Sequence, residues 1–351
     1  MHWHIPGNPS LGGVLDIGLK CTHSCKFCYY SFLDKTDDQF RGMRRASFRS
    51  LDDCKKILDL LKAQGIIHVD VTGGEPTLHP NIVDIVRYAR EIGLAIRIIT
   101  LGQFLKKKNM PGCEGKMQLD ALLDAGVTNF LFSYHACAPD LFRTITGEDW
   151  NTLEESMTTL DSQGFSYTAN TVVYAENYTH LPEIATHLVR KHSAHYMHNF
   201  IIMNAYYEWN KDGKAFGTQA RYKDIFPYLL DAVATLEDNG RAVNIRYAPL
   251  CAVKGLERNL VGMVGNRWDP YEWRNAGGHF QGSTPEQAAA LFPVQPLQGL
   301  ANHHRQAGGK VFLDQCGTCA AQAVCDGVDV NYATQHGGDE FVPYRLGDVG
   351  P

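Results

Sequence analysis

The chain has 351 residues, of which 44% are hydrophobic and 20% charged, and its formal net charge is −5. This composition is typical of a globular protein with room for one large domain and a smaller module. The mild acidity argues against a general nucleic-acid-binding protein, whose surface would be basic, and no apolar run approaches the roughly 20 residues needed to span a membrane.

The chain begins Met1-His2-Trp3-His4-Ile5-Pro6, which lacks the basic and apolar regions of a secretory signal. We therefore expect a cytoplasmic protein. In that compartment its ten cysteines are predicted to be thiols or metal ligands rather than disulfides. Their distribution supports this interpretation, because two triplets lie far apart in the sequence, within 21–28 and 316–325.

Short apolar runs alternate with amphipathic helical segments over the first part of the chain, after a loop that we predict at 31–49. The expected strands cover 14–19, 66–72, 94–100, 127–133, 165–173 and 196–203. The expected helices cover 51–64, 81–92, 117–125, 139–145, 151–163 and 180–192. This alternation demands a parallel sheet with helices outside, and six such passes fit an α/β fold with a partial (β/α)6 TIM-like barrel at 12–204.

Beyond the barrel the pattern changes. We expect a connecting segment at 205–245, with a helix around 218–238 and a short strand at 243–247. Residues 246–351 are then a small cysteine-rich module, which includes a Gly-, Pro- and Asn-rich region at 255–310. The aromatic run Asn204–Asn210 follows the sixth strand, where it would either shape a substrate pocket or pack the module against the barrel.

The chemistry of such barrels lies at the carboxyl ends of the strands. The loop that holds Cys21, Cys25 and Cys28 follows the first strand directly. Three thiolates on one short loop hold a [4Fe–4S] cluster by three irons and leave the fourth iron open to a small ligand. Two alternatives are a zinc site with His23 as the fourth ligand and a disulfide.

The Cys21-x3-Cys25-x2-Cys28 spacing, with Phe27 before the last cysteine, resembles the signature of radical S-adenosylmethionine (SAM) enzymes. The Gly73-Gly74-Glu75-Pro76 run resembles the methionine-binding motif of that family. The resemblance implies that SAM binds the open iron and is reductively cleaved to a 5′-deoxyadenosyl radical, which abstracts hydrogen from a substrate. It also implies an electron donor such as flavodoxin or ferredoxin.

The same resemblance implies a set of SAM contacts. Gly73, Gly74 and Glu75 would lie near the methionine amino group, although a plain strand-to-helix turn also explains the two glycines. Ser133 and Arg143 resemble the contacts to the methionine carboxylate, and an arginine fork suits a carboxylate. The alternative for Arg143 is an exposed helix position. Asn170 is a candidate SAM or substrate contact, or a loop cap.

Cys316-x2-Cys319-x5-Cys325 resembles the auxiliary-cluster module of the SPASM or shorter twitch type. The resemblance implies one auxiliary [4Fe–4S] cluster, and a zinc knuckle is the alternative. Cys251 and Asp329 are the two candidates for the fourth ligand. We favour Cys251, because thiolate is the softer and more usual iron–sulfur ligand.

These features together predict an enzyme that carries out an oxidative modification of a peptide or small molecule. One alternative is a radical SAM epimerase in which Cys137 or Cys251 returns a hydrogen atom. The other is a non-catalytic iron–sulfur or zinc protein. Production of 5′-deoxyadenosine separates the last from both enzymes.

Overall fold

The computed structural model describes residues 12–28, 40–204, 218–261, 273–278 and 309–347. Residues 205–210 of the aromatic run therefore lie outside the described part, and only Asn204 of that run is seen. None of the described helices is both long and apolar enough to cross a membrane.

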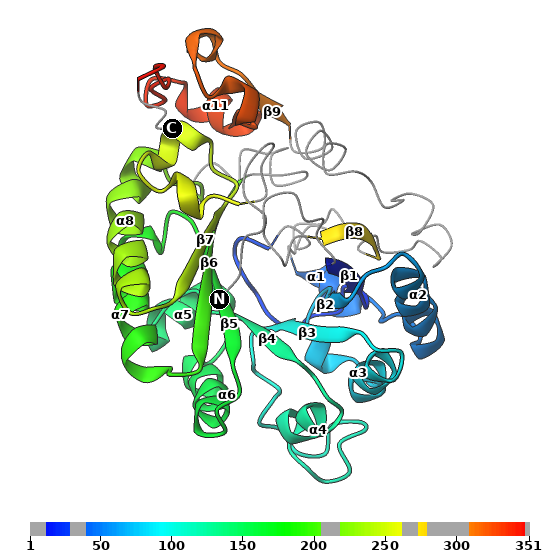
Figure 1. Ribbon diagram of the computed structural model, residues 1–351. Coiled ribbons are helices and arrows are strands. Elements are labelled where there is room, and N and C mark those ends of the chain that lie inside the picture. The colour runs from blue at the N-terminus through cyan, green and yellow to red at the C-terminus, as the bar shows by residue number, and fades with distance from the viewer. Residues whose placement is uncertain (1–11, 29–39, 205–217, 262–272, 279–308, 348–351) are drawn as a thin grey trace.

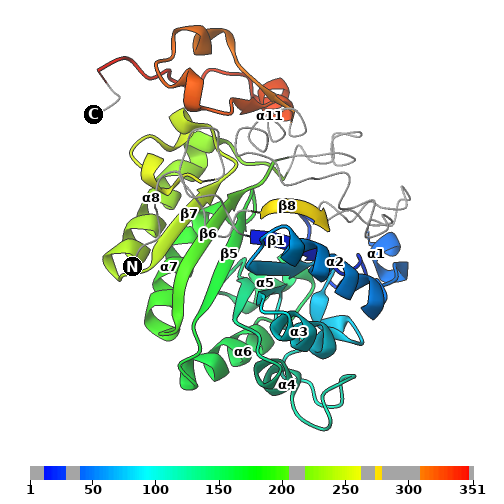
Figure 2. The same ribbon diagram turned by 45° about the vertical axis from the view of Figure 1, so that its right-hand side comes forward.

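A curved parallel sheet forms the centre of the molecule, with helices along its outer face (Figures 1 and 2). In the described part the sheet has eight strands in the order β7-β6-β5-β4-β3-β2-β1-β8, and each pair of neighbours is parallel. The strands are β1 (Gly12–Asp16), β2 (His68–Thr72), β3 (Ala95–Thr100), β4 (Asn129–Ser133), β5 (Tyr167–Val173), β6 (His195–Ile202), β7 (Ala242–Arg246) and β8 (Trp273–Gly278). The predicted partial barrel is confirmed.

The helices of the outer layer are α2 (Leu51–Ala63), α3 (Ile82–Glu91), α4 (Gln118–Asp124), α5 (Pro139–Thr146), α6 (Trp150–Ser162), α7 (Leu181–Lys191) and α8 (Tyr222–Asp238). Helix α2 illustrates why they form. The Ser50 hydroxyl accepts a hydrogen bond from the Asp53 amide at its start, and Cys54, Ile57 and Leu58 on one face are buried against the sheet.

The sheet extends beyond the six predicted strands at both edges. Strand β7 was expected in a connecting segment, but it pairs with β6 along Met197–Ile201, so α8 and β7 continue the alternation of the barrel. Strand β8 was not predicted, because its Trp-Arg-Asn-Ala-Gly-Gly sequence has no strand-like pattern and only the pairing with β1 reveals it.

The predicted loop at 31–49 is wrong over Arg41–Arg45, which form the short helix α1 around the buried Met43.

Strand alternation divides the sheet into two faces of different character. On the helix side the side chains are largely apolar, such as Phe130, Phe132 and Phe200. On the inner side they are largely polar. Arg97 forms two hydrogen bonds with the carboxylate of Asp70, at 2.7 and 2.6 Å, and both residues are almost fully buried. Polar side chains therefore line much of the barrel interior, where they form hydrogen bonds and ion pairs.

The cysteine module, residues 309–347, packs at one end of the barrel beside the segment 250–261 (orange to red in Figures 1 and 2). It contains an antiparallel pair, β9 (Lys310–Val311) and β10 (Val328–Asp329), followed by α11 (Val330–His336). The hydroxyl of Tyr332 accepts a hydrogen bond from the Tyr222 amide at the start of α8, and their rings lie 4.6 Å apart. These contacts fix the module on the barrel.

Candidate active site

The cysteine loop, residues 21–28, lies at the carboxyl end of β1 and is held by backbone hydrogen bonds from both sides. The Cys21 amide donates to the carbonyl of Met43. The amides of Ser24 and Lys26 donate to the last carbonyls of α5, at Thr146 and Ile145. The loop therefore bridges α1 and α5 instead of standing free in solvent.

The three thiols of this loop are brought together. Burial raises the pKa of the Cys25 thiol well above its usual value, and the nearby Cys28 and Cys21 raise it further. Burial, followed by the Glu75 carboxylate, raises the pKa of Cys21. No disulfide joins any of the ten cysteines, all of which the structure describes, so the disulfide alternative finds no support. Phe27 packs edge-on against His135 and Tyr174, with ring centroids 4.6 and 5.4 Å apart.

Gly73 and Gly74 run beside the backbone that leads into the cysteine loop. The amides of Gly74 and Glu75 donate to the carbonyls of Gly18 and Lys20. A Cβ atom at Gly73 would lie 2.3 Å from the Gly18 oxygen, and one at Gly74 would lie 2.2 Å from the Lys20 oxygen. Gly73 also has a φ of 133°, which side chains rarely adopt. Both positions therefore require glycine because the neighbouring backbone lies too close for a side chain, whether or not the segment binds a ligand.

Glu75 is fully enclosed beneath the cysteine loop. Its Oε1 accepts hydrogen bonds from the hydroxyls of Thr77 and Thr100, at 2.5 and 2.6 Å. Its Oε2 accepts from the Leu101 amide and lies 3.1 Å from His23 Nε2. The other ring nitrogen of His23 lies 2.7 Å from Glu148. Although burial opposes it, the pairing with Glu148 and Glu75 raises the pKa of His23 to about 9.

This network has two consequences. Both ring nitrogens of His23 pair with carboxylates, so the structure does not offer His23 as a fourth ligand for a zinc ion. Glu75, in turn, ties the Gly-Gly-Glu segment to the cysteine loop and to the end of β3. Its predicted closeness to the methionine group stays a prediction, and sequence reasoning did not foresee the anchoring partners His23 and Glu148.

Ser133 and Asn170 lie opposite each other on β4 and β5, facing the barrel interior. Asn170 is 7% exposed, and its Oδ1 has no hydrogen-bond partner among the described residues. The same register continues to Asn199 on β6 and Asn244 on β7, and Asn244 donates to Asn199 at 3.1 Å. Sequence reasoning missed these last two, although Asn244, between Val243 and Ile245 of a strand, was a usable signal.

Arg143 is placed apart from these residues. Its side chain is 69% exposed on α5, and its guanidinium lies 3.9 Å from the Asp149 carboxylate. This position fits the exposed-helix alternative, and the predicted contact with a SAM carboxylate stays a prediction.

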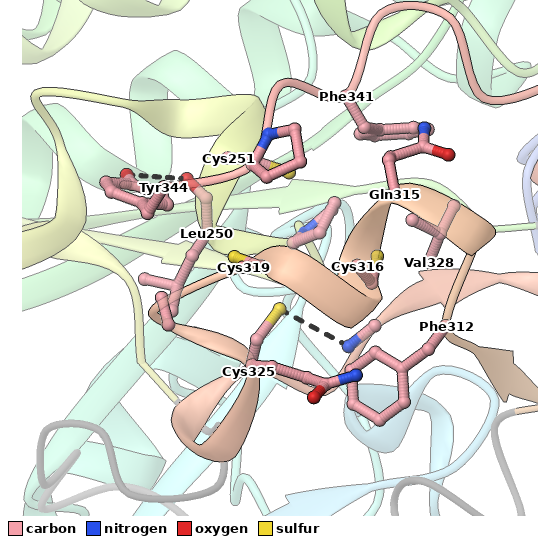
Figure 3. A pocket seen from close by; sticks show the side chains of 15 residues that line it. Leu250, Cys251, Phe312, Gln315, Cys316, Cys319, Cys325, Val328, Phe341 and Tyr344 are labelled. Carbon is pink, nitrogen blue, oxygen red and sulfur yellow. Dashed lines mark hydrogen bonds between the residues drawn. The ribbon is translucent and has the colours of Figure 1, made fainter. Parts of the chain in front are cut away.

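A second set of thiols lines a pocket between the cysteine module and the barrel (Figure 3). Cys316, Cys319 and Cys325 come from the module, and Cys251 comes from the short helix Leu250–Val253 that follows β7. Burial, followed by the three other thiols, raises the pKa of Cys251 to about 12. We call this site the four-cysteine pocket.

Asp329 does not line the four-cysteine pocket. Its Oδ1 caps α11 by accepting hydrogen bonds from the amides of Asn331 and Tyr332, at 3.0 and 3.1 Å. The preference for Cys251 over Asp329 therefore gains geometric support, and the identity of the fourth ligand stays a prediction.

Both cysteine sets fit an iron–sulfur cluster by the chemistry of their donors. Thiols buried without a cation carry raised pKa values, and a metal removes that penalty because a coordinated thiol is deprotonated. The first set offers three thiols on one loop, and the second offers four on two segments. These are the donor numbers expected for a cluster with one open iron and for a closed cluster.

Comparison with known proteins gives the family. The model of the radical SAM superfamily matches residues 15–188. A "PqqA peptide cyclase" of Rhodopseudomonas palustris is 27% identical over 177 residues, which is 50% of this chain and 42% of the relative. A "Probable GTP 3′,8-cyclase" of Saccharolobus solfataricus is 30% identical over 136 residues, 38% of this chain and 39% of the relative. The chain thus matches less than half the length of these curated relatives.

Among solved structures, Streptococcus suis SuiB bound to S-adenosylmethionine has a TM-score of 0.59 at 14% identity, covering 96% of this chain and 76% of that one. SuiB bound to the precursor peptide SuiA has a TM-score of 0.58 at 14% identity, covering 95% of this chain and 74% of that one. At this identity the likeness concerns the fold. Together with the matched family model, the three-cysteine loop and the parallel half-barrel, it leads to one conclusion: the chain belongs to the radical SAM superfamily.

Proposed function

We propose that this protein is a radical SAM enzyme that oxidatively modifies a peptide. The observation that carries the proposal is the convergence of Cys21, Cys25 and Cys28 at the carboxyl edge of the half-barrel, beside the Gly73–Glu75 segment. A cluster held by these thiols would supply one-electron reductive cleavage of SAM to a 5′-deoxyadenosyl radical.

The chain's own residues have three tasks in this reaction. The network of His23, Glu75 and Glu148 holds the cysteine loop in one conformation. Phe27, packed between His135 and Tyr174, shields one side of the loop from water. On the inner face of the sheet, Ser133 and the carboxamide oxygen of Asn170, which no described residue hydrogen-bonds, offer polar contacts to SAM or to the substrate.

The four-cysteine pocket supports the oxidative character of the reaction. Cys251, Cys316, Cys319 and Cys325 are the residues that would hold an auxiliary [4Fe–4S] cluster. Hydrogen abstraction would leave an unpaired electron on the substrate, and a cluster held by these four thiols would supply a redox centre to take up that electron as the substrate releases a proton. Peptides are the favoured substrate class because the relatives named above include a PqqA peptide cyclase and SuiB, which binds a precursor peptide.

The test is SAM cleavage by the anaerobically reconstituted protein with a strong chemical reductant. We expect 5′-deoxyadenosine and methionine in equal amounts, and about eight iron atoms per chain for two four-iron clusters. Replacing Cys21, Cys25 and Cys28 together with alanine should halve the iron content and abolish cleavage. A triple variant that still cleaves SAM would overturn the proposal.

The substrate class is tested separately. Short peptides encoded beside the gene are incubated with the reduced enzyme and SAM, and their masses are measured. The proposal expects a loss of hydrogen in pairs, without deuterium uptake from heavy water. Solvent deuterium in a product of otherwise unchanged composition would instead identify an epimerase, with Cys137 as the thiol to examine because Cys251, the other candidate hydrogen donor, lines the four-cysteine pocket.

A further inference from the structure

The outer helix layer carries a cluster of imidazole and carboxylate groups that neither cysteine site uses. Glu154 on α6 lies between His187 on α7 and His192, the residue that follows the last turn of α7. Glu154 Oε2 is 2.9 Å from His187 Nε2, and Glu154 Oε1 is 3.1 Å from His192 Nε2. The three candidate ligand atoms all lie within 4.8 Å of one another.

The surroundings of His192 match those of a metal-binding histidine. Its Nδ1 lies 2.8 Å from Asp161 Oδ2, and this bond directs Nε2 toward Glu154. A carboxylate behind the ligating imidazole, which fixes its tautomer and orientation, is the usual arrangement around protein-bound zinc. Asp161 is itself held by hydrogen bonds from the Ala194 amide and the Tyr167 hydroxyl, at 2.8 and 3.1 Å.

Access and charge also favour a cation. The His192 side chain is fully buried, whereas His187 and Glu154 are 20% and 17% exposed, so a further ligand can approach from solvent. A dication with both imidazoles neutral cancels the charges of Glu154 and Asp161. The rival arrangement is a protonated His192 bridging the two carboxylates. Although burial opposes protonation, the hydrogen bonds with Asp161 and Glu154 raise the pKa of that ring to about 9. In that arrangement a neutral His187 would donate its Nε2–H to Glu154 Oε2 at 2.9 Å, so zinc binding itself is the property that separates the two arrangements.

We propose that Glu154, His187 and His192 form a zinc site in the wall of the barrel, with Asp161 orienting His192. Two imidazoles and one carboxylate, with a fourth position open to water, are a familiar donor set for zinc. The site would clamp α6 to the carboxyl end of α7. It lies in the helix layer and is therefore distinct from the cysteine loop and the four-cysteine pocket.

The experiment uses the fully cluster-loaded protein, so that the cysteines are occupied by iron and sulfide. Zinc is added, the excess is removed, and zinc per chain is measured together with the zinc-edge X-ray absorption spectrum. We expect about one zinc per chain with nitrogen and oxygen ligands at about 2.0–2.1 Å and no sulfur shell at about 2.3 Å. His187→Ala should weaken zinc binding at least tenfold, and Asp161→Asn by about 10- to 100-fold.

The matched control is His180→Ala. His180 also pairs with a carboxylate, at 2.9 Å from Glu183, but no second histidine among the described residues joins this exposed pair in a possible metal-ligand group. Zinc binding that is equal in the control and the wild type, and reduced in Glu154→Gln, supports the proposal even if His187→Ala fails to fold. Absence of bound zinc in the loaded wild type, or a sulfur shell that survives in Glu154→Gln, overturns it and leaves an ion-pair network.

Discussion

At the scale of single residues, the candidate active site depends on side chains that satisfy one another. Glu75 lies 2% exposed, yet its carboxylate stays ionised. Although burial favours the neutral form, hydrogen bonds from His23, Thr100 and Thr77 lower its pKa. An ionised carboxylate in such a place is stable only with this many donors. Glu75, which the sequence predicts to lie near bound SAM, is therefore also a structural anchor.

Cys251 and Asp329 are distinguished by a pair of single substitutions. Cys251→Ala should lose the auxiliary cluster or reduce it to a three-iron form, because one of the four thiols that line the pocket is gone. Asp329→Ala should keep the cluster and lower the free energy of unfolding by about 0.5–2 kcal/mol, because it removes the N-cap of α11. Iron analysis, electron paramagnetic resonance and denaturant unfolding read out the two effects. Cluster loss in Asp329→Ala with an intact cluster in Cys251→Ala would make Asp329 the ligand.

His198 should make the fold sensitive to acid. Burial, with a smaller contribution from His135, lowers the pKa of His198 to about 3, and its Nε2 lies 3.0 Å from Thr171 Oγ1. The unfolded chain takes up a proton near the ordinary pKa of about 6.5, so the native state binds fewer protons below that pH. Stability should therefore fall as the pH drops below about 6.5, by up to about 1.4 kcal/mol per pH unit.

The measurement is the urea midpoint of the cluster-loaded protein across this pH range under anaerobic conditions. His198→Gln should flatten the pH dependence, whereas the same change at the exposed His180 should leave it as in the wild type. An unchanged slope in His198→Gln would assign the acid sensitivity to other groups.

At the scale of elements, the Gly73–Glu75 segment behaves as an added strand beside residues 18–20. Two backbone hydrogen bonds join them, and no side chain fits between. Because the cysteine loop begins at Cys21, directly after residues 18–20, this pairing fixes the position of the loop relative to β2. The two glycines thus serve the loop as well as any bound ligand.

Gly74→Ala should disrupt this pairing, because the new methyl group would meet the Lys20 carbonyl, which is backbone and has no other conformer to adopt. We expect a loss of about 1–3 kcal/mol in the free energy of unfolding and poor iron loading at the cysteine loop. Gly347→Ala is the matched control, since a Cβ there meets nothing within 4 Å. Normal loading in Gly74→Ala would show that the loop tolerates displacement of its neighbour.

At the scale of the whole molecule, the cysteine module depends on the barrel for its fourth thiol. Three cysteines of the four-cysteine pocket lie in the module and Cys251 lies on the barrel side. Glu340 is a centre of the docking contacts. It accepts hydrogen bonds from the Tyr332 hydroxyl at 2.6 Å and the Lys223 amide at 2.8 Å, and it pairs with Arg221.

Glu340→Ala should therefore loosen the module and lower iron at the auxiliary site while the cysteine loop keeps its cluster. Tyr332, Lys223 and Arg221 would each lose their partner on Glu340, which should lower the free energy of unfolding by about 1–3 kcal/mol. Limited proteolysis within 309–347, together with iron content and SAM cleavage, measures the effect. Asp339→Ala, at the exposed neighbouring position, is the control. Equal protease resistance in both variants would contradict a docking role for Glu340.

The sequence by itself determined the alternation of strands and helices, the two cysteine sets and the half-barrel. Those features depend on local periodicity and on spacing along the chain, which are short-range properties. Tertiary structure alone decided the partners of Glu75, the place of β8 beside β1, and the meeting of Cys251 with three thiols more than sixty residues away. It also decided the cluster of Glu154, His187 and His192, because side chains on two helices meet only when the sheet beneath sets their spacing.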